Sequence, residues 1–304
     1  MGDAHSPSIH WQTLFTEDWH EGWMHSGVVE LSDKRLVFEA PGGGALLFLT
    51  PSTNEINRVT VPVAAAHAIV SVIDKDGECL WICDPGAEPP GQVIKISLSG
   101  DVLESIKQPI GSSEEIGKWR PTSIAIDKAG NKWVADGYGL SLLHCIRESG
   151  EIETFDGSAS GQPFDCPHGI AIAERNGTTM IVVADRANKR LVYLDINGNF
   201  LRNVQGELIT SPSSIVAHDN SLYVTDLFST IIEIDKDDNI RALVPSKPKN
   251  ENEGWPNTVE NGEVVGPLLS TGAMNSPHGI SISRSGEILF TDWCLGGRVV
   301  RLTP

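Results

Sequence analysis

The sequence predicts an all-β fold, a single six-bladed β-propeller domain (residues 1–304) with four-stranded antiparallel blades. A self-similar unit recurs six times at intervals of roughly 40 to 65 residues, a spacing typical of propeller blades. Asn-Gly, Asp-Gly and single-Gly turns separate alternating apolar runs within the units, as in β-hairpins. No helical period of comparable length appears.

Each unit begins with a short strand of small residues and turns at Gly, Asp or Asn. A β-branched strand that ends in Asp follows. The clearest copy is residues 121–137, in which residues 123–126 and 132–136 are the first two strands. An alternating third strand comes next, as at residues 190–195, and a fourth strand completes the unit. The six copies begin near residues 25, 66, 121, 167, 212 and 277.

The last copy contains only three strands before Pro304, so its edge needs an outer strand to cover it. The remaining strand-like segment is residues 9–15, and we expect it to close the ring by completing the sixth blade. Residues 245–268 are rich in Asn, Glu, Gly and Pro and predict a long insertion loop on the fifth blade.

The charge balance excludes several kinds of partner. Lys and Arg total 23 against 40 Asp and Glu, a net charge of −17. Such a chain repels phosphate backbones and anionic lipid, so we expect no nucleic acid and no membrane partner. Five irregularly spaced cysteines do not suggest a disulfide framework, and the first residues lack a signal-peptide pattern. We therefore expect a cytoplasmic monomer that acts on a small-molecule substrate.

Three histidines occur at equivalent places in alternate units. The first strand of each propeller blade lines the central axis and carries a small residue followed by an aliphatic one. The six residues that directly precede this pair, one from each blade, should therefore form a ring around the axis. That ring reads Gly27 or its neighbour, His67, Thr122, His168, Ser213 and His278. Alternate blades are roughly a third of a turn apart, so His67, His168 and His278 should converge on the axis.

Three neutral imidazoles around an open position are typical of a catalytic metal site, with zinc the first choice and iron or cobalt as alternatives. The competing interpretation is that each histidine only forms hydrogen bonds in a polar channel. The remaining histidines are expected at surface or edge positions: His5, His10, His20, His25, His144 and His218.

Other polar residues fall at the ends of second strands. Tyr138 and Arg186 follow the second strands of the third and fourth units. A phenol near a cation and a metal can ionise below its usual pKa and act as a base, and a guanidinium can hold a carboxylate or carbonyl oxygen. Cys166, two residues before His168, is expected to be a buried, inert thiol, with a metal ligand or a nucleophile as the alternative. The Asp residues that end these strands recur in nearly every unit and are expected to be scaffolding: Asp84, Asp136, Asp185, Asp226 and Asp292.

Residues 134–141, 161–171 and 183–190 together resemble the lyase domain of peptidylglycine α-amidating enzymes, a family of NHL-type propellers. The resemblance implies zinc held by His67, His168 and His278, a catalytic base at Tyr138 and a substrate-binding Arg186. It also implies a reaction in which a carbinolamide is opened to an amide and glyoxylate.

Two of the chain's departures from that family concern substrate binding and structural calcium. Residues 38–43 lack the second active-site Arg, and Gly279 stands where the family has an Asp for structural calcium. We therefore do not expect the calcium site, and we expect a small hydroxylated or acyl substrate other than a glycine-extended peptide. The alternatives are a metal-dependent hydrolase such as a lactonase and a non-catalytic NHL scaffold that binds a protein.

Overall fold

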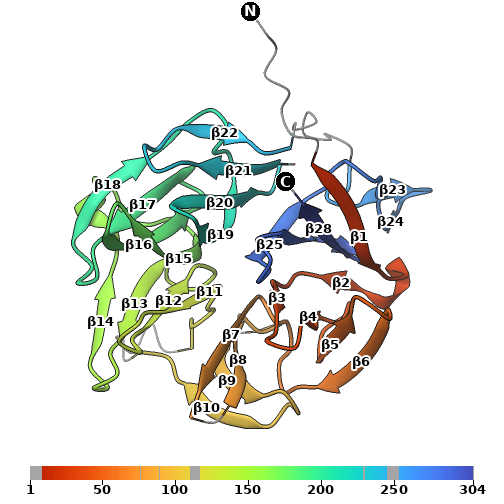
Figure 1. The fold of residues 1–304 in the computed structure, drawn as a ribbon, viewed down its shortest axis with the longest axis horizontal. Coiled ribbons are helices and arrows are strands. Elements are labelled where there is room, and N and C mark those ends of the chain that lie inside the picture. The colour runs from red at the N-terminus through yellow and green to blue at the C-terminus, as the bar shows by residue number, and fades with distance from the viewer. Residues whose placement is uncertain are drawn as a thin grey trace, which may run out of the picture.

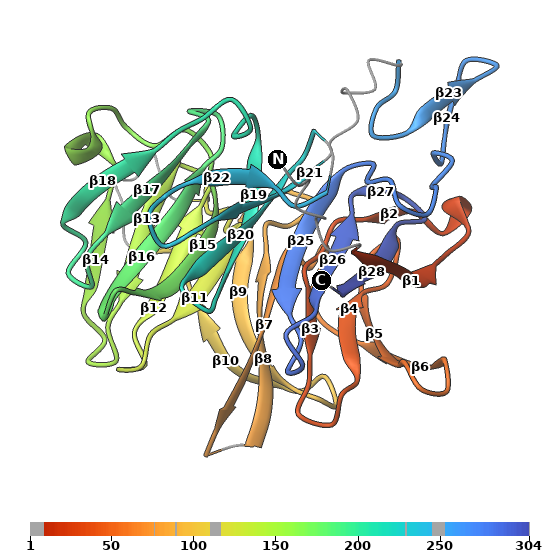
Figure 2. The same cartoon turned by 45° about the horizontal axis from the view of Figure 1, so that its top comes forward.

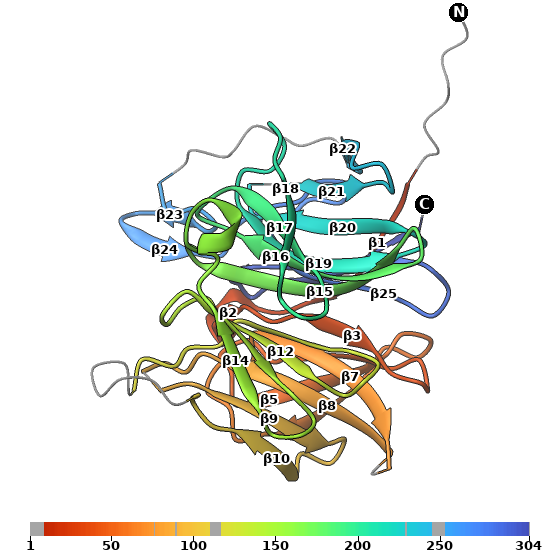
Figure 3. The same ribbon diagram turned by 90° about the vertical axis from the view of Figure 1, so that its left-hand side faces the viewer.

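The computed structural model describes residues 9–75, 77–88, 90–109, 117–228, 230–244 and 253–303. Six four-stranded antiparallel sheets surround a central axis (Figure 1), which confirms the predicted all-β, six-bladed propeller. Seen from the side, strands β15 to β22 lie above strands β3 to β10 (Figure 3). No described helix is long or apolar enough to cross a membrane.

The strands follow the chain from the axis outward in the first five blades. Blade one contains β3 (Val28–Glu30), β4 (Leu36–Glu39), β5 (Ala45–Thr50) and β6 (Glu55–Thr60). Blade two contains β7 (Ala68–Asp74), β8 (Gly77–Asp84), β9 (Gln92–Ser97) and β10 (Val102–Ile106). Blade three contains β11 (Ser123–Ile126), β12 (Lys132–Asp136), β13 (Leu142–Ile146) and β14 (Ile152–Phe155).

Blades four to six continue the pattern. Blade four contains β15 (Pro167–Arg175), β16 (Thr178–Asp185), β17 (Arg190–Leu194) and β18 (Phe200–Val204). Blade five contains β19 (Pro212–His218), β20 (Ser221–Asp226), β21 (Thr230–Ile234) and β22 (Ile240–Ala242). Blade six contains β25 (Pro277–Ile282), β26 (Ile288–Asp292), β28 (Arg298–Thr303) and the N-terminal β1 (His10–Thr16).

The ring closes as the sequence predicts. Strand β1 pairs antiparallel with β28, from His10 opposite Thr303 to Thr16 opposite Arg298, so the two ends of the chain share one blade. A second, short link joins β2 (Trp23–Met24) to β27 (Cys294–Leu295). Two 3-10 helices, Trp19–Glu21 and Ser158–Ser160, are the helical elements of the described chain.

The predicted insertion after blade five is only partly described. Its residues 245–252 lie outside the described part of the chain. The remainder forms a small hairpin of β23 (Thr258–Glu260) and β24 (Glu263–Val265), which stands away from the ring (Figure 2).

The hydrophobic core is divided among the contacts between neighbouring blades. Six clusters of buried apolar residues occur, and each joins one pair of adjacent blades around the ring. Phe15 of β1 and Leu289 of β26 pack with Phe38 and Leu36 of blade one, so the contact that closes the ring has an apolar interior like the others. Burial on both faces of the middle strands explains why they are continuously apolar in the sequence.

Glycine is required where the inner strands approach one another most closely. A Cβ on Gly279 would lie 2.4 Å from Gly27 Cα and 2.6 Å from the Ser26 carbonyl oxygen. A Cβ on Gly169 would lie 2.4 Å from the Ser213 carbonyl oxygen. Both glycines directly follow a ring histidine, so small residues at this position let the blades bring those histidines to the axis.

We expect Gly279→Ala to lower the free energy of unfolding by about 1–3 kcal/mol, because the new methyl group meets rigid backbone. Urea denaturation measures the loss. Gly27→Ala is the matched control: Gly27 lies against Gly279, but its own Cβ would face blade two and approach Ile69 N only to 3.4 Å. Equal stability of the two variants would contradict the steric explanation.

The strand-end carboxylates have the structural role that the sequence indicates. Asp84 accepts hydrogen bonds from the backbone N–H groups of Ala64, Ala65 and Gly86. Asp226 does the same with Thr210 and Ser211. These hydrogen bonds connect the segment just before a blade's inner strand to the last residue of its second strand. Asp185 and Asp292 are also paired with buried arginines, Arg190 and Arg298.

Glu39 occupies the corresponding position in blade one and is 2% exposed. Its Oε1 accepts a hydrogen bond from Ala66 N in blade two. Burial raises the pKa of Glu39 to about 8; the Ala66 bond opposes this rise, and the charge of Asp84 adds to it. Glu39 therefore keeps its proton at a pH where an ordinary carboxyl group is ionised.

This pKa makes stability depend on pH. Between the ordinary pKa of 4.5 and about 8, the unfolded chain releases a proton that the folded protein keeps. The contribution of Glu39 to the free energy of unfolding therefore falls as pH rises through that window. We expect wild type to lose stability relative to Glu39→Gln from about pH 5 to 8, as measured by urea denaturation. Glu260→Gln, at an exposed position, is the control and should lose stability with pH as wild type does. A pH-independent stability difference between wild type and Glu39→Gln, or an equal pH-dependent difference between wild type and Glu260→Gln, would contradict this account.

Candidate metal and substrate site at the propeller axis

The inner strands bring the three ring histidines together at the axis. His67 directly precedes β7, and His168 and His278 are the second residues of β15 and β25. The ring centroids lie 4.6 Å apart for His67 and His168, 4.7 Å for His67 and His278, and 5.1 Å for His168 and His278. The three side chains are buried. Alternate blades thus place these imidazoles in mutual contact, and their use as metal ligands stays a prediction.

Neighbouring blades orient two of these rings. His67 Nδ1 lies 2.6 Å from the Thr122 carbonyl oxygen, and His168 Nδ1 lies 3.0 Å from the Ser213 carbonyl oxygen. A carbonyl oxygen only accepts, so Nδ1–H is the donor in each case and Nε2 keeps its lone pair. Thr122 and Ser213 are the ring residues of the blades that follow. This is the arrangement in which a backbone carbonyl fixes the tautomer of a metal-binding histidine.

His278 differs from the other two. It is 1% exposed, and neither ring nitrogen has a hydrogen-bond partner among the described residues. An unpaired polar group costs free energy when it is buried, so such groups call for an explanation. A bound cation or a substrate atom at the axis would supply the missing partner.

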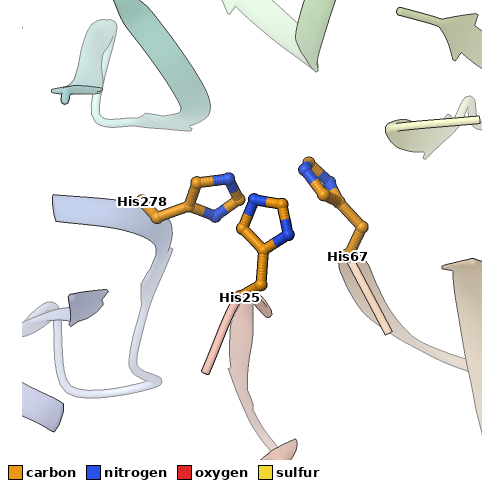
Figure 4. A group of neighbouring side chains, drawn as sticks. All are labelled: His25, His67 and His278. Carbon is orange, nitrogen blue, oxygen red and sulfur yellow. The ribbon is translucent and has the colours of Figure 1, made fainter. Parts of the chain in front are cut away.

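His25 is a fourth imidazole in this cluster, although the sequence predicts a surface or edge position for it. The His25 ring lies 4.7 Å from the His67 ring and 4.4 Å from that of His278. Candidate ligand nitrogens of His25, His67 and His278 all lie within 4.8 Å of one another (Figure 4). The expectation for His25 was wrong because the repeat aligns Gly27-Val28 with the other small-aliphatic pairs. That alignment places Ser26 in the ring and His25 one residue before it.

The four imidazoles of His25, His67, His168 and His278 are here called the hub. The other histidines lie outside the hub or outside the described residues. His144 was also expected at a surface or edge, but it is buried in blade three, where its Nδ1 lies 2.9 Å from Thr154 Oγ1. His10 and His20 are exposed and His218 is partly exposed. His5 lies outside the described residues.

Burial keeps the hub imidazoles neutral. Desolvation lowers the pKa of His67, His168 and His278 well below the ordinary value, and neighbouring imidazoles and Arg186 act in the same direction. Burial and the charge of Arg186 lower the pKa of His25 to about 4. Neutral imidazoles do not repel a cation, and their lone pairs are available as ligands at neutral pH.

Tyr138 reaches this cluster from the end of blade three's second strand. Its Oη lies 3.0 Å from His168 Nε2 and 3.3 Å from His67 Nε2. The sequence predicts a lowered pKa for a phenol that lies beside both a cation and a metal. Without a metal, burial raises the pKa of Tyr138, and the nearby Arg186 opposes that rise only in part. The phenol therefore keeps its proton and can donate it to an imidazole nitrogen.

Arg186 lies beside Tyr138, as the sequence predicts from their loops. Its Nη1 donates to Tyr138 Oη at 3.4 Å and its Nη2 lies 3.1 Å from Cys166 Sγ. No carboxylate forms an ion pair with Arg186 in the part of the chain that the structure describes. Desolvation raises the pKa of the Cys166 thiol, which agrees with an inert thiol better than with a nucleophile.

Arg120 places a second guanidinium near Tyr138, which the sequence patterns did not indicate. The Arg120 guanidinium carbon lies 6.0 Å from the centre of the Tyr138 ring. Its side chain donates to the carbonyl oxygens of Pro85 and Gly86, each at 3.1 Å. Arg120 directly precedes the Pro that opens its unit, a position that Cys166, Ser211 and Ser276 occupy in other units. The residue type at this position varies, so the repeat gave no signal for an arginine.

No protein-family model matches this chain, and no curated protein matches its sequence. Solved structures do match. A streptogramin B lyase is 16% identical, with 97% of both chains covered and a TM-score of 0.64. A catalytically inactive histidine-to-alanine variant of virginiamycin B lyase from Staphylococcus aureus, solved with quinupristin, is 14% identical over 98% of this chain and 100% of that one (TM-score 0.64). A putative gluconolactonase is 10% identical over 98% and 92%, with a TM-score of 0.63. At these identities the likeness shows a shared propeller fold.

Proposed function

We propose that the protein is a metal-dependent lyase that acts on a small hydroxylated or acyl substrate at the propeller axis. His67, His168 and His278 would hold a divalent cation, with zinc the first choice, and His25 is a fourth donor within reach. The observation that carries the proposal is the buried His278 ring, which lacks any hydrogen-bond partner among the described residues and lies against three other neutral imidazoles.

The donor set fits such an ion. Imidazole nitrogens suit zinc and neighbouring transition metals, and the carbonyl partners of His67 and His168 leave Nε2 unprotonated. Zinc ligands in a tetrahedron are roughly 3.4 Å apart. Candidate nitrogens of His25, His67 and His278 lie within 4.8 Å of one another, and His168 is outside that group, so the rings must move closer together to bind the ion. When bound there, the cation supplies a Lewis acid that polarises a substrate oxygen.

The chain's own residues supply the rest of the chemistry. Burial alone keeps Tyr138 protonated, but the positive charge of a cation held by the imidazoles would favour the phenolate, which Arg186 steadies through its hydrogen bond. In the carbinolamide reaction that the motif resemblance implies, this phenolate accepts the proton of the substrate hydroxyl group. The oxygen electron pair forms a carbonyl group, and the C–N bond breaks. The departing nitrogen then takes the proton back from Tyr138. No electrons are exchanged with a cofactor, and the products are an amide and a carbonyl compound.

The second candidate is a metal-dependent hydrolase that opens lactones, which the similarity to a putative gluconolactonase favours. Under this alternative the same cation would activate water, and Arg186 would bind the ring carbonyl group. The third is a non-catalytic scaffold, in which the histidines would be incidental.

Two measurements separate these functions. Metal analysis after gentle purification and zinc loading should find about one equivalent per chain, and less than about half an equivalent would favour the scaffold. The loaded protein is then incubated with an α-hydroxyglycine amide and, separately, with a panel of lactones. Release of amide and glyoxylate supports the lyase, whereas hydrolysis of lactones alone supports the hydrolase and contradicts our proposal.

A further inference from the structure

The loops around the imidazole cluster carry different side chains on two alternate blades, four and six. In blade four, Arg186 directly follows the strand-end Asp185, and in blade six, Trp293 directly follows the strand-end Asp292. The two residues therefore occupy equivalent positions at the same end of their second strands. The Trp293 ring lies 5.5 Å from the ring of His25, which places it against the imidazole cluster.

Trp293 belongs to a continuous group of aromatic rings, here called the aromatic wall: Trp23, Phe228, Trp255 and Trp293. Trp23 stacks on Trp293 at 5.5 Å, and Trp255 meets Trp293 edge-on at 6.0 Å. Phe228 lies 5.1 Å from Trp255. Its members come from the segment before blade one, from the loops of blades five and six, and from the insertion.

The aromatic wall is not fully covered by the described chain. Trp23 is 41% exposed, and Phe228, Trp255 and Trp293 are partly exposed. Three of the chain's eight tryptophans thus keep accessible surface beside a cluster of polar side chains. A contiguous apolar patch of this kind at the rim of a polar site is typical of a ligand-binding surface.

The other side of the hub is polar and cationic. The His25 and Tyr138 rings lie 6.3 Å apart, and the Arg186 guanidinium carbon lies 5.3 Å from the centre of the Tyr138 ring. Arg186 has no carboxylate partner among the described residues, although the chain carries a net charge of −17. A guanidinium without a carboxylate partner is suited to bind a carboxylate or acyl oxygen of a ligand.

We propose that the substrate has an aromatic group that packs on the aromatic wall, and that it has a carboxylate or acyl oxygen that binds Arg186. The reacting bond then lies between the two, beside the imidazoles and Tyr138. This assignment rests on the proposed function for the reaction itself, but it names the class of molecule: small aryl-bearing acyl compounds.

Binding of simple probes to the metal-free protein tests this assignment without any turnover. The probes are 3-phenylpropionate, propionate and 3-phenylpropan-1-ol, and calorimetry or ligand-observed NMR measures their dissociation constants. We expect 3-phenylpropionate to bind about tenfold more tightly than either of the others, since each lacks one of the two contacts. Equal dissociation constants for 3-phenylpropionate and propionate would overturn the proposal.

Variants assign the two contacts. Trp293→Leu should remove most of the preference for 3-phenylpropionate over propionate. Arg186→Gln should weaken 3-phenylpropionate and leave 3-phenylpropan-1-ol unchanged. Trp19→Leu is the matched control, because the Trp19 ring stacks on His20 and not on the aromatic wall. An equal loss of preference in Trp19→Leu would contradict the assignment.

The two proposals can fail separately. If the protein binds no metal and releases no product but keeps the aryl preference, the lyase proposal fails and the aromatic wall remains a binding surface. If the zinc-loaded protein cleaves aliphatic and aryl substrates with equal kcat/KM, the lyase proposal holds and the assignment of substrate class is wrong.

Discussion

His278→Ala is expected to weaken zinc binding by more than about 100-fold, because loss of a ligand should exceed the 10- to 100-fold effect of losing a residue that only supports one. The imidazole of His278 is buried without a hydrogen-bond partner among the described residues. Its removal therefore breaks no hydrogen bond of the described protein, and the effect should fall on the metal. Competition against a chromogenic chelator measures the zinc affinity, and urea denaturation checks that the variant folds.

His144→Ala is the control for this variant. His144 is also buried, but it lies in blade three between Trp119 and Thr154, away from the imidazole cluster. Its removal should leave zinc affinity unchanged. Wild-type zinc affinity in His278→Ala, or an equal loss in both variants, would contradict the ligand assignment. His25→Ala, measured beside them, reports whether the fourth imidazole also binds the ion.

Tyr138→Phe is expected to lower kcat for lyase substrates by about 10²- to 10⁴-fold, the usual contribution of a positioned acid–base group. The substitution removes only the hydroxyl group that lies between His67 and His168 and accepts the hydrogen bond from Arg186. Zinc stoichiometry should stay at the wild-type value. Steady-state kinetics with an α-hydroxyglycine amide and metal analysis of the same samples provide the two readings.

Tyr193→Phe is the matched control, since Tyr193 is likewise a buried phenol beside an arginine. Its Oη accepts a hydrogen bond from Arg175 at 2.9 Å, in blade four and outside the hub. This variant should keep wild-type kcat. If Tyr138→Phe also keeps wild-type kcat, Tyr138 has no acid–base role.

The fold could be predicted from the sequence because a propeller repeats its local signals. The inner strand of small residues, the turn and the strand-end Asp recur from blade to blade. Because blade six lacked an outer strand in its own unit, residues 9–15 could be predicted to supply it. The small residues of the inner strands allow neighbouring blades to approach closely, as the contact of Gly279 with blade one shows. These features depend on local pattern and on ring closure, and both are visible in one sequence.

Parts of the site that break the repeat could not be predicted. His25 lies one residue before the ring position, and Trp255 belongs to an insertion with no equivalent in other blades. Arg120 stands at a repeated position, but the residue type there varies from unit to unit. Their proximity to the hub depends on how loops pack over the end of the propeller. The depth of Tyr138 could not be predicted either: burial raises its pKa and outweighs the nearby guanidinium, and the sequence does not show how deeply a phenol is buried.

X-ray absorption spectroscopy of the zinc-loaded protein tests the central claim most directly. Imidazole ligands give nitrogen scattering at about 2.0–2.1 Å together with the outer-shell signal of intact rings. We predict one tightly held zinc ion with at least three imidazoles, and loss of one imidazole in His278→Ala. A zinc ion surrounded only by oxygen atoms, or no zinc retained after dialysis, would show that the histidines at the axis do not form a metal site.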